Sequence, residues 1–589
     1  MGTISDKLMR IINTKEDIRQ ALISKGYDVP TSIPFKEYAK MILDLPCKVD
    51  SFPDIEGIVA RYSASGLTNE QMAANPVWVD KTGNGYDLQM KNFFWGGMSG
   101  VGGYVDNWNS SADWAVNSYW VNSHTDHKLQ FITASTVVQV KSKNVYNAEN
   151  VYKNILNVNG LTEAVNKGAV GSLEIFVTDS ITSKVIKIFS FETDGVIQIS
   201  FDDVLQDYYV NYFVTGNNTN DIDITIEQLP LYPGALVFDG VDDYGVCDNF
   251  PILTKEKGYT VVALRQWIEE KNDSTALVSN CKNWNQDDAF LFEYNNLRIN
   301  FLNVAISFGH VSSVDRGKSP FSYQTSKLYN GKNIKPGSFI GSNELVVGKG
   351  NKDFPTVSNA AIWEIVILDH DATEEELTKI KDYFVKTYPW LFPDQAWTVV
   401  GKTNEDEDRA TIANITGNGN NLVLSNFGFA EGSGYNEEGE YAGYLVTDGV
   451  DDKIISSIFK MGNDWTVIGD WELINTGKND NAGIVKFDSI VIYNYNPILI
   501  NIKNGRNNLI PDQNTVNAIC SDGRIYSKDW KESIYNEETE STSKNFLTIG
   551  YSGNAYTKIA FKNLAIYPTV LSREDCIKAY NYLQTLKAK

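Results

Sequence analysis

The chain has few of the residues that build metal sites and disulfide frameworks. Its 589 residues include only four histidines and five cysteines, scattered as Cys47, Cys247, Cys281, Cys520 and Cys576. The cysteine count is odd and no CxxC pair occurs, so the sequence predicts neither a disulfide framework nor a zinc site. The one histidine cluster, His124-Thr-Asp-His127, has no helical context and no evident third ligand, which favours a polar loop over a metal site.

Basic charge and long apolar runs are also scarce. The chain has 52 Lys and Arg against 74 Asp and Glu, a net charge of −22. Nucleic-acid binding needs a basic surface, so the charge argues against it and against docking on an anionic bilayer. No stretch approaches 18 apolar residues, and the N-terminus MGTISDKLMRIINTKED has no apolar core. We therefore expect neither membrane insertion nor a signal peptide.

Catalytic motifs are missing as well. The sequence contains no G-x-S-x-G, no P-loop and no Cys–His arrangement. Asp221-Ile-Asp-Ile-Thr-Ile-Glu227 is superficially similar to the acidic strand of some jelly-roll glycosidases, because strand alternation places Asp221, Asp223, Thr225 and Glu227 on one face. Its first acid is Asp and its spacing is one residue longer than the wider family form. The segment favours a solvent-facing strand, and no catalytic residue is predicted.

The sequence repeats itself, and one copy is interrupted. Residues 80–95 (DKTGNGYDLQMKNFFW) and 414–429 (NITGNGNNLVLSNFGF) share seven of sixteen residues at an offset of 334. A second match pairs Asp239-Gly-Val-Asp-Asp243 with Asp448-Gly-Val-Asp-Asp452 at an offset of 209. The first copy therefore holds about 125 extra residues between its two motifs. An insertion of this size predicts a domain.

Both copies read as antiparallel β structure. Short strands with alternating apolar residues are separated by Gly, Asn and Asp, and aromatic residues make up 12% of the chain. Each copy ends in a strand, a turn and a capped helix, at 363–384 and 562–583, with the capping pairs Thr373–Glu376 and Ser572–Asp575. These features, with the turn Val237–Tyr244, resemble the concanavalin A-like (laminin-G-like) jelly roll.

The expected organisation is mainly β, with four parts. An N-terminal helical segment covers 1–47, and the first jelly-roll domain covers 55–104 and 233–395. A β-sandwich is inserted over 105–232, and the second jelly-roll domain covers 396–589. Alternating segments such as Gly171–Val177 and Val185–Phe189 predict the sandwich in the insert.

Two local patterns predict ligands. Trp108, Trp114, Tyr119 and Trp120 are interleaved with Asn and Ser where the insert begins, a combination that matches the two faces of a sugar. The same rings would also serve to pack the joint between two domains or a subunit interface. The two DGVDD turns invite calcium, although Asp-Gly is itself a turn signal and Asp side chains brace turns, so no cofactor is predicted.

The N-terminal segment predicts attachment. Apolar residues at helical spacing, Leu8, Ile11, Ile12, Ile18 and Leu22, are many for so small a unit, which favours burial against a partner or sister subunits. The run Thr14–Gly26, then Val29-Pro and Pro34–Ala39, resembles the N-terminus of fibre and tail-associated proteins from crAss-like phages of Bacteroidetes. Ile58–Tyr62 and Trp78–Gly85 are similar to that group too.

This second resemblance implies a virion structural protein, made in the host cytoplasm and attached to head or tail. It implies a homo-oligomer, with a trimer favoured, that contacts other virion proteins through its N-terminus and binds host surface polysaccharide without catalysis. Two alternatives stay open from the residues. One is a virion depolymerase or glycoside hydrolase that cleaves capsular glycan. The other is a bacterial surface lectin with an export signal upstream of Met1.

Overall fold

The chain divides into two compact units, residues 1–54 and 55–589. The computed structural model describes Lys15 and residues 52–588, with gaps at 117–120, 133–139, 147–152, 202–203, 205, 217–221, 254–256, 270–274, 284–289, 294–318, 334–339, 351, 354–355, 438–440, 458–461, 475–482, 488–489, 494–498, 503–505, 510–515, 528–529, 535–546 and 553–554. The predicted attachment residues Leu8, Ile11, Ile12, Ile18 and Leu22 lie outside the described residues.

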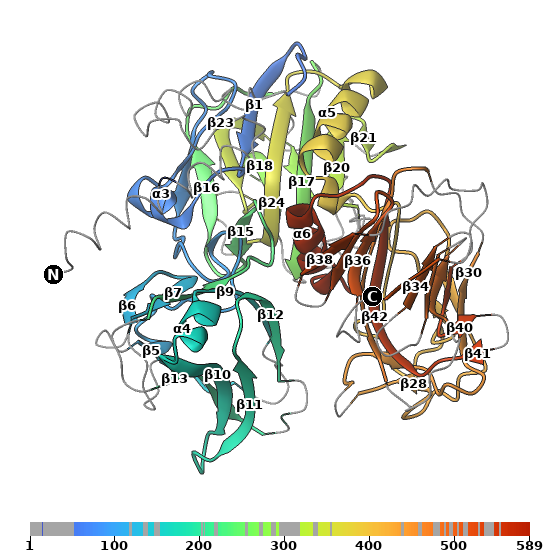
Figure 1. Ribbon diagram of the computed structural model, residues 1–589. Helices are drawn as coiled ribbons and strands as arrows, with labels where there is room; N and C mark the ends of the chain where they lie inside the picture. The colour runs from blue at the N-terminus through green and yellow to red at the C-terminus, as the bar shows by residue number, and fades with distance from the viewer. Residues whose placement is uncertain are drawn as a thin grey trace. The chain divides into compact units, whose positions relative to one another are not determined.

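The second unit is mainly β, as the sequence predicts, and its sheets are antiparallel (Figure 1). The helices described in it are α3 (Asn69–Ala74), α4 (Leu161–Asn166), α5 (Glu374–Thr387), α6 (Arg573–Gln584) and the short 3-10 helix η3 (Pro389–Leu391). A search of the described helices finds none with the length and apolar character needed to cross a membrane.

Strands from both sides of the insert build the first module, residues 55–104 and 233–395. One sheet has the order β22 (Lys332–Asn333), β21 (Leu328–Tyr329), β20 (Phe321–Thr325), β17 (Thr260–Glu269), β24 (Asn359–Leu368), β15 (Leu236–Asp239), β4 (Gly100–Val101), with β1 (Ile58–Ser63) also paired to β24. The other has the order β19 (Leu291–Phe292), β18 (Val278–Asn283), β23 (Ile340–Val347), β16 (Tyr244–Cys247), β3 (Leu88–Lys91), β2 (Val77–Trp78). The two sheets share one core, in which Val261 of β17 and Leu345 of β23 are fully buried.

The second module, residues 396–589 with β25 at its start, also has two sheets over one core. The first runs β28 (Gly434–Tyr435), β29 (Leu445–Val446), β42 (Ile559–Tyr567), β31 (Thr466–Leu473), β36 (Val516–Cys520), β37 (Arg524–Ser527), β38 (Glu532–Ile534), with β25 (Gln395–Thr398) paired to β42. The second runs β26 (Thr411–Ile412), β27 (Leu422–Ser425), β30 (Lys453–Ser456), β39 (Leu547–Ile549), β32 (Gly483–Phe487), β33 (Ile490–Tyr493), β34 (Leu499–Ile502), β35 (Arg506–Leu509). A two-stranded ribbon, β40 (Tyr551–Ser552) and β41 (Ala555–Tyr556), completes it.

The two modules have the same strand order. In both, the long strand before the last helix, β24 or β42, lies between the strand that precedes the DGVDD turn, β15 or β29, and the second strand after that turn, β17 or β31. β1 and β25 add to the same strand in each copy. The sequence repeat is therefore a repeat of whole β-sandwich modules. The prediction that these modules have the connectivity of a jelly roll stays a prediction.

The described residues of the insert, 105–232, form their own pair of five-stranded sheets. One has the order β11 (Val185–Phe191), β10 (Val170–Asp179), β13 (Tyr208–Gly216), β8 (Val140–Ser142), β5 (Trp114–Val116). The other has the order β12 (Gly195–Ser200), β9 (Lys153–Asn159), β14 (Ile224–Gln228), β7 (Lys128–Phe131), β6 (Val121–His124). The chain leaves and returns at one place, where the Leu231 and Tyr232 amides donate to the carbonyls of Gly103 and Gly102 at 2.8 Å.

The last helix of each module begins at the predicted cap. The Thr373 side chain accepts from the Glu376 amide at 3.3 Å, and Glu376 accepts from the Thr373 amide at 2.8 Å, which completes a capping box. Ser572 accepts from the Asp575 amide at 3.1 Å.

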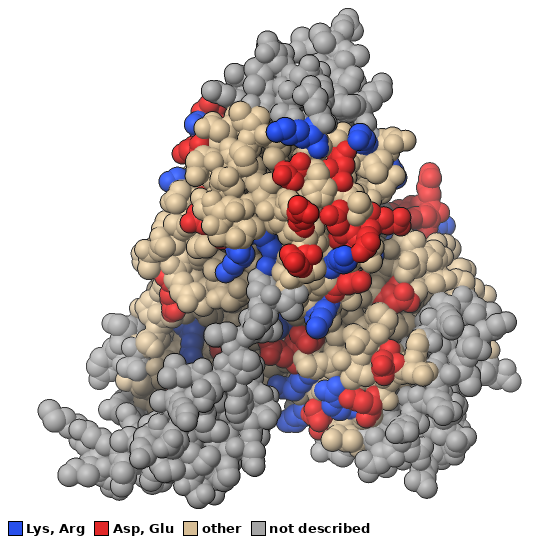
Figure 2. Space-filling view, turned by 90° about the horizontal axis from the view of Figure 1, so that it is seen from above, with Lys and Arg blue, Asp and Glu red and all other residues tan. Residues whose placement is uncertain are grey.

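Figure 2 shows Asp and Glu gathered over the middle of one face with Lys and Arg scattered among them. Charges of both signs favour a solvated surface there.

Candidate functional site

The repeated TGNG loop is braced by one side chain that precedes it. In the first module Asp80 is buried and accepts from the Arg61 amide at 3.0 Å, the Thr82 amide at 3.0 Å and the Thr82 hydroxyl at 2.7 Å. In the second module Asn414 takes its place and accepts from the Ala396 amide at 3.2 Å and the Thr416 amide at 3.0 Å. The Asp80 carboxylate and the Asn414 side-chain oxygen thus accept equivalent bonds from the backbone, so the loop does not need a negative charge at this position.

A second repeated loop, residues 92–100 and 426–434, follows the same backbone path in both copies. It begins with asparagine at positive φ, +67° at Asn92 and +70° at Asn426, a conformation that asparagine tolerates better than most residues. The side-chain amide of Asn92 donates to the Asp242 carbonyl at 3.0 Å, and that of Asn426 donates to the Asp451 carbonyl at 2.9 Å. Each loop is therefore tied to its DGVDD turn.

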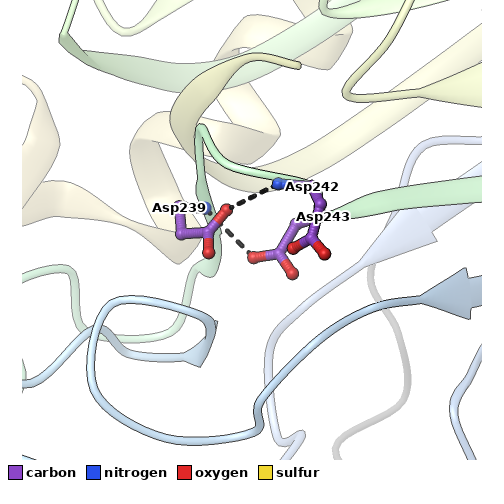
Figure 3. Close-up of side chains that lie close together, drawn as sticks. All are labelled: Asp239, Asp242 and Asp243. Atoms are coloured by element: carbon purple, nitrogen blue, oxygen red, sulfur yellow. Dashed lines mark hydrogen bonds between the residues drawn. The ribbon is translucent and has the colours of Figure 1, made fainter. Parts of the chain in front are cut away.

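The DGVDD turn is held by its own carboxylates, as Figure 3 shows for the first copy. Asp239 accepts from the Val241 amide at 2.7 Å, and Asp243 accepts from the Asp239 amide at 3.0 Å and from the Ser99 hydroxyl at 3.0 Å. The second copy repeats the first two bonds, at 2.7 and 2.8 Å. Among the described residues, the two turns are the groups of carboxylates close enough to hold a metal ion. Bonding within the turn accounts for their clustering without one.

Burial changes the acidity of the last aspartate in each turn. Removal from water raises the pKa of Asp243 to about 7 and that of Asp452 to about 6, against an ordinary value of 3.8. Neighbouring carboxylates act in the same direction, while the bonds from Ser99 and the Asp239 amide oppose it for Asp243. Each folded turn therefore keeps a proton at a pH where the unfolded chain has lost it.

This difference predicts a pH-dependent stability. For both aspartates the pKa in the folded chain lies above the pKa in the unfolded chain, so the stability that each contributes is greatest below about pH 4. This contribution is lost as the pH rises, up to about 7 for Asp243 and about 6 for Asp452. The slope is at most about 1.4 kcal/mol per pH unit for each group. Urea unfolding across this range should show that Asp243→Asn removes the slope between about pH 6 and 7 and about half of the slope between pH 4 and 6, while Asp452→Asn removes only about half of the slope between pH 4 and 6. An unchanged slope in both variants would contradict the assignment.

The DGVDD turn and the 92–100 loop of the first module together expose apolar and polar side chains to solvent. We define the turn surface of the first module as Asn92, Phe94, Val241 and Asp242. Phe94 is 67% exposed and Val241 is 70% exposed, high values for apolar side chains. Both are held on braced backbone, because the Phe94 amide donates to Ser99 Oγ at 2.8 Å and Ser99 donates to Asp243.

The second module repeats this surface without the aromatic ring. Its residues are Asn426, Gly428, Val450 and Asp451, and Val450 is 71% exposed. The Gly428 amide donates to Ser433 Oγ at 2.8 Å, the same bond that Phe94 makes. The two turn surfaces thus share a backbone and differ in one ring.

Two of the four predicted sugar-binding residues lie in the core of the insert and not on its surface. Trp108 and Trp114 are 1% and 3% exposed and belong to the core of the insert. Both rings pack edge-on or tilted against Tyr212, with centroids 5.6 and 5.9 Å away. Their faces are covered by the insert itself, so they are core residues and not a sugar-binding surface or a joint between domains. Tyr119 and Trp120 lie outside the described residues.

The other polar candidates are spread over the surface of the insert. His124 is exposed, while the His127 ring stacks on Tyr104 with centroids 4.6 Å apart and bonds Asp126 at 2.8 Å. Burial opposes the charged imidazolium, but the bond to Asp126 and the charges of Asp126, Glu227 and Glu70 together outweigh it and raise the pKa of His127. His124 and His127 form no metal-binding group with other described residues.

The acidic strand faces solvent, as predicted. Ile224 and Ile226 of β14 point into the core, and Asp223, which precedes the strand, is exposed and accepts from Gln130 Nε2 at 2.6 Å. Asp221 lies outside the described residues. The alternation places the carboxylates on the outer face of a sheet.

Two buried ion pairs in the first module have no counterpart among the sequence predictions. Arg265 of β17 meets Glu293, and both are fully buried, with side-chain exposures of 2% and 0%. Arg61 of β1 meets Glu364 of β24 at 3.0 Å, and Tyr388 donates to the same carboxylate at 2.8 Å. The partners are 28 and 303 residues apart, and of the four residues Glu364 alone lies in a repeated segment, so no pattern in the sequence brings the partners together.

No family model and no curated protein matches this chain. The solved structures that match include Trypanosoma rangeli sialidase in complex with sialic acid, at 9% identity and a TM-score of 0.25, over 78% of this chain and 82% of that one. The Botulinum neurotoxin serotype D binding domain matches at 10% identity and a TM-score of 0.19, over 59% and 89%. A tandem CBM22 domain from Paenibacillus barcinonensis Xyn10C matches at 11% identity and a TM-score of 0.15, over 47% and 99%. Likenesses this low carry no argument about function.

Proposed function

We propose that this chain is a non-enzymatic adhesin of the phage-fibre type, which binds host surface glycan through the turn surface of its first module. The observation that carries the proposal is the exposed phenyl ring of Phe94 on a loop that is braced at both ends. A ring that folding leaves in water is available to a ligand, and the backbone that carries it is held in place before binding.

The neighbours of the ring suit a sugar. A sugar ring has one apolar face and a rim of hydroxyl groups, so it needs a flat apolar partner beside hydrogen-bonding groups. Phe94 and Val241 supply the apolar contact, and the exposed carboxylate of Asp242 supplies acceptors for hydroxyl groups. An open surface of this kind binds weakly, and presentation on an oligomer would strengthen binding through avidity.

The remaining parts take supporting roles in this proposal. The N-terminal segment would attach the chain to other virion proteins or to sister subunits, with a trimer favoured. The second module would supply a further copy of the same turn. The phage assignment rests on the resemblance of the N-terminal sequence, and the binding surface rests on the fold.

The two modules supply a matched test. Phe94→Gly gives the first module the loop residue of the second, and it should lower the affinity for capsular polysaccharide from a Bacteroidetes host roughly tenfold, about 1.4 kcal/mol. Gly428→Phe should add a second binding surface. A Cβ at Gly428 would lie 3.5 Å from Ser433 Oγ, an ordinary contact, so the loop accepts the ring. Phe94→Tyr keeps the flat ring and is the control that should still bind.

Calorimetry or glycan-coated biosensors would measure these affinities on the full chain. Unchanged binding in Phe94→Gly would remove the turn surface from the proposal. Binding in Gly428→Phe that stays at the wild-type stoichiometry would show that the ring alone does not make the site.

A further inference from the structure

The last helix brings two cysteines together that are distant in the sequence. Cys520 ends β36 and Cys576 lies in the first turns of α6, and both are fully buried. Both carry free thiols, and each side chain lies close enough to change the pKa of the other. The Thr466 hydroxyl of β31 donates to Cys520 Sγ at 3.7 Å and accepts from the Leu571 amide at 2.9 Å, just before α6, so Cys520 lies beside the start of that helix.

Buried cysteine often serves only as a small apolar residue, and the first module tests that explanation. Thr260 and Thr466 occupy the same place in the two copies, because each donates to a carbonyl and accepts from an amide just before the last helix, at 2.7–2.9 Å. Thr260 pairs with Thr325 and Thr466 pairs with Cys520. On the last helix, Leu377 corresponds to Cys576. The fold is therefore satisfied by Thr and Leu, and it does not require two thiols.

The surroundings make the two thiols unequal. The interaction with Cys576, with help from Thr466 and the nearby Arg524 guanidinium, lowers the pKa of Cys520, whereas the same interaction and burial raise the pKa of Cys576. Cys520 is thus the thiol that ionises first and the better nucleophile at neutral pH.

We propose that Cys520 and Cys576 are a disulfide-forming site that joins α6 to β36 when the chain meets a small-molecule disulfide such as oxidised glutathione. The Cys520 thiolate attacks one glutathione sulfur, breaks the glutathione disulfide and releases one reduced glutathione. The Cys576 thiolate, after losing its proton, attacks the Cys520 sulfur of the mixed disulfide and releases the second. The two cysteines lose two electrons and two protons, and one glutathione disulfide becomes two thiols.

Burial sets the rate of this reaction. Neither sulfur is accessible in the folded module, so the oxidant reaches them only when α6 opens. The bond would then hold the helix that closes the sandwich. The site differs from the turn surface and does not depend on the glycan proposal.

The test uses the full, reduced chain at neutral pH. After incubation with oxidised glutathione, remaining thiols are blocked and the chain is digested without reduction for mass spectrometry. A peptide linking Cys520 to Cys576 should accumulate while Cys247 and Cys281 are recovered as blocked thiols. The second module should unfold roughly 5 °C or more higher after oxidation.

Matched variants come from the first module. Cys520→Thr and Cys576→Leu place its residues in the second, and neither variant should gain stability from the oxidant. Thr325→Cys with Leu377→Cys should create a second link in the first module. Recovery of glutathione adducts alone, or of no linked peptide while circular dichroism shows the chain folded, would overturn the proposal.

Discussion

Replacement of Glu293 with alanine is expected to lower the stability of the first module by roughly 3–5 kcal/mol, because it leaves the Arg265 guanidinium buried without its counter-charge. The carboxylate is unusually well bonded. Arg265 Nε donates to its two oxygens at 3.0 and 2.8 Å, and Ser322, Trp267 and Tyr329 donate at 2.6, 2.7 and 2.9 Å. Loss of the carboxylate therefore leaves several buried hydrogen-bond donors and the Arg265 charge without their partner.

A double variant separates charge from packing. Arg265→Met with Glu293→Leu removes both charges and keeps apolar volume, so it should recover a large part of the loss. Urea unfolding with hydrogen exchange to locate the affected module is the measurement. A loss below about 1 kcal/mol for Glu293→Ala would mean that water reaches the guanidinium and that the pair is not buried as described.

Asp80→Ala is expected to cost the first module about 2–4 kcal/mol, since it removes the acceptor for the Arg61 amide, the Thr82 amide and the Thr82 hydroxyl at a buried position. Asp80→Asn should cost little, because Asn414 does the same work in the second module. Thermal or urea unfolding of the two variants side by side is the measurement.

The reciprocal pair completes this test. Asn414→Ala should destabilise the second module by a similar amount, and Asn414→Asp should be tolerated. If Asp80→Asn and Asp80→Ala are equally harmful, the loop depends on charge and the equivalence of the two loops is wrong.

Most of the doubled fold could be predicted because its signals are local. The TGNG loop and the DGVDD turn are short segments whose side chains bond their own backbone, so the same residues give the same turn in both copies. The capping pairs at Thr373 and Ser572 work for the same reason. The alternation of apolar and polar residues around Asp223 likewise predicts correctly that this side chain is exposed to solvent.

The misses concern contacts between distant segments. Trp108 and Trp114 were interpreted from their polar neighbours in sequence, but their rings point into the core against Tyr212, a residue about a hundred positions away. The Arg265–Glu293 pair and the two thiols of the second module arise only when strands and helix pack, and their spacing in the sequence carries no period. Phe94 was visible as part of the repeat, yet its exposure depends on the loop conformation.

The measurement that tests the account most directly asks whether the chain binds glycan without cleaving it. The full chain would be incubated with purified capsular polysaccharide from a Bacteroidetes host, bound protein would be recovered by co-sedimentation, and new reducing ends would be followed over time. We expect the chain to be retained on the polysaccharide in a manner that depends on Phe94, with reducing ends at the level of a protein-free control. Sustained release of reducing ends by wild-type chain would contradict it and would make the protein a depolymerase.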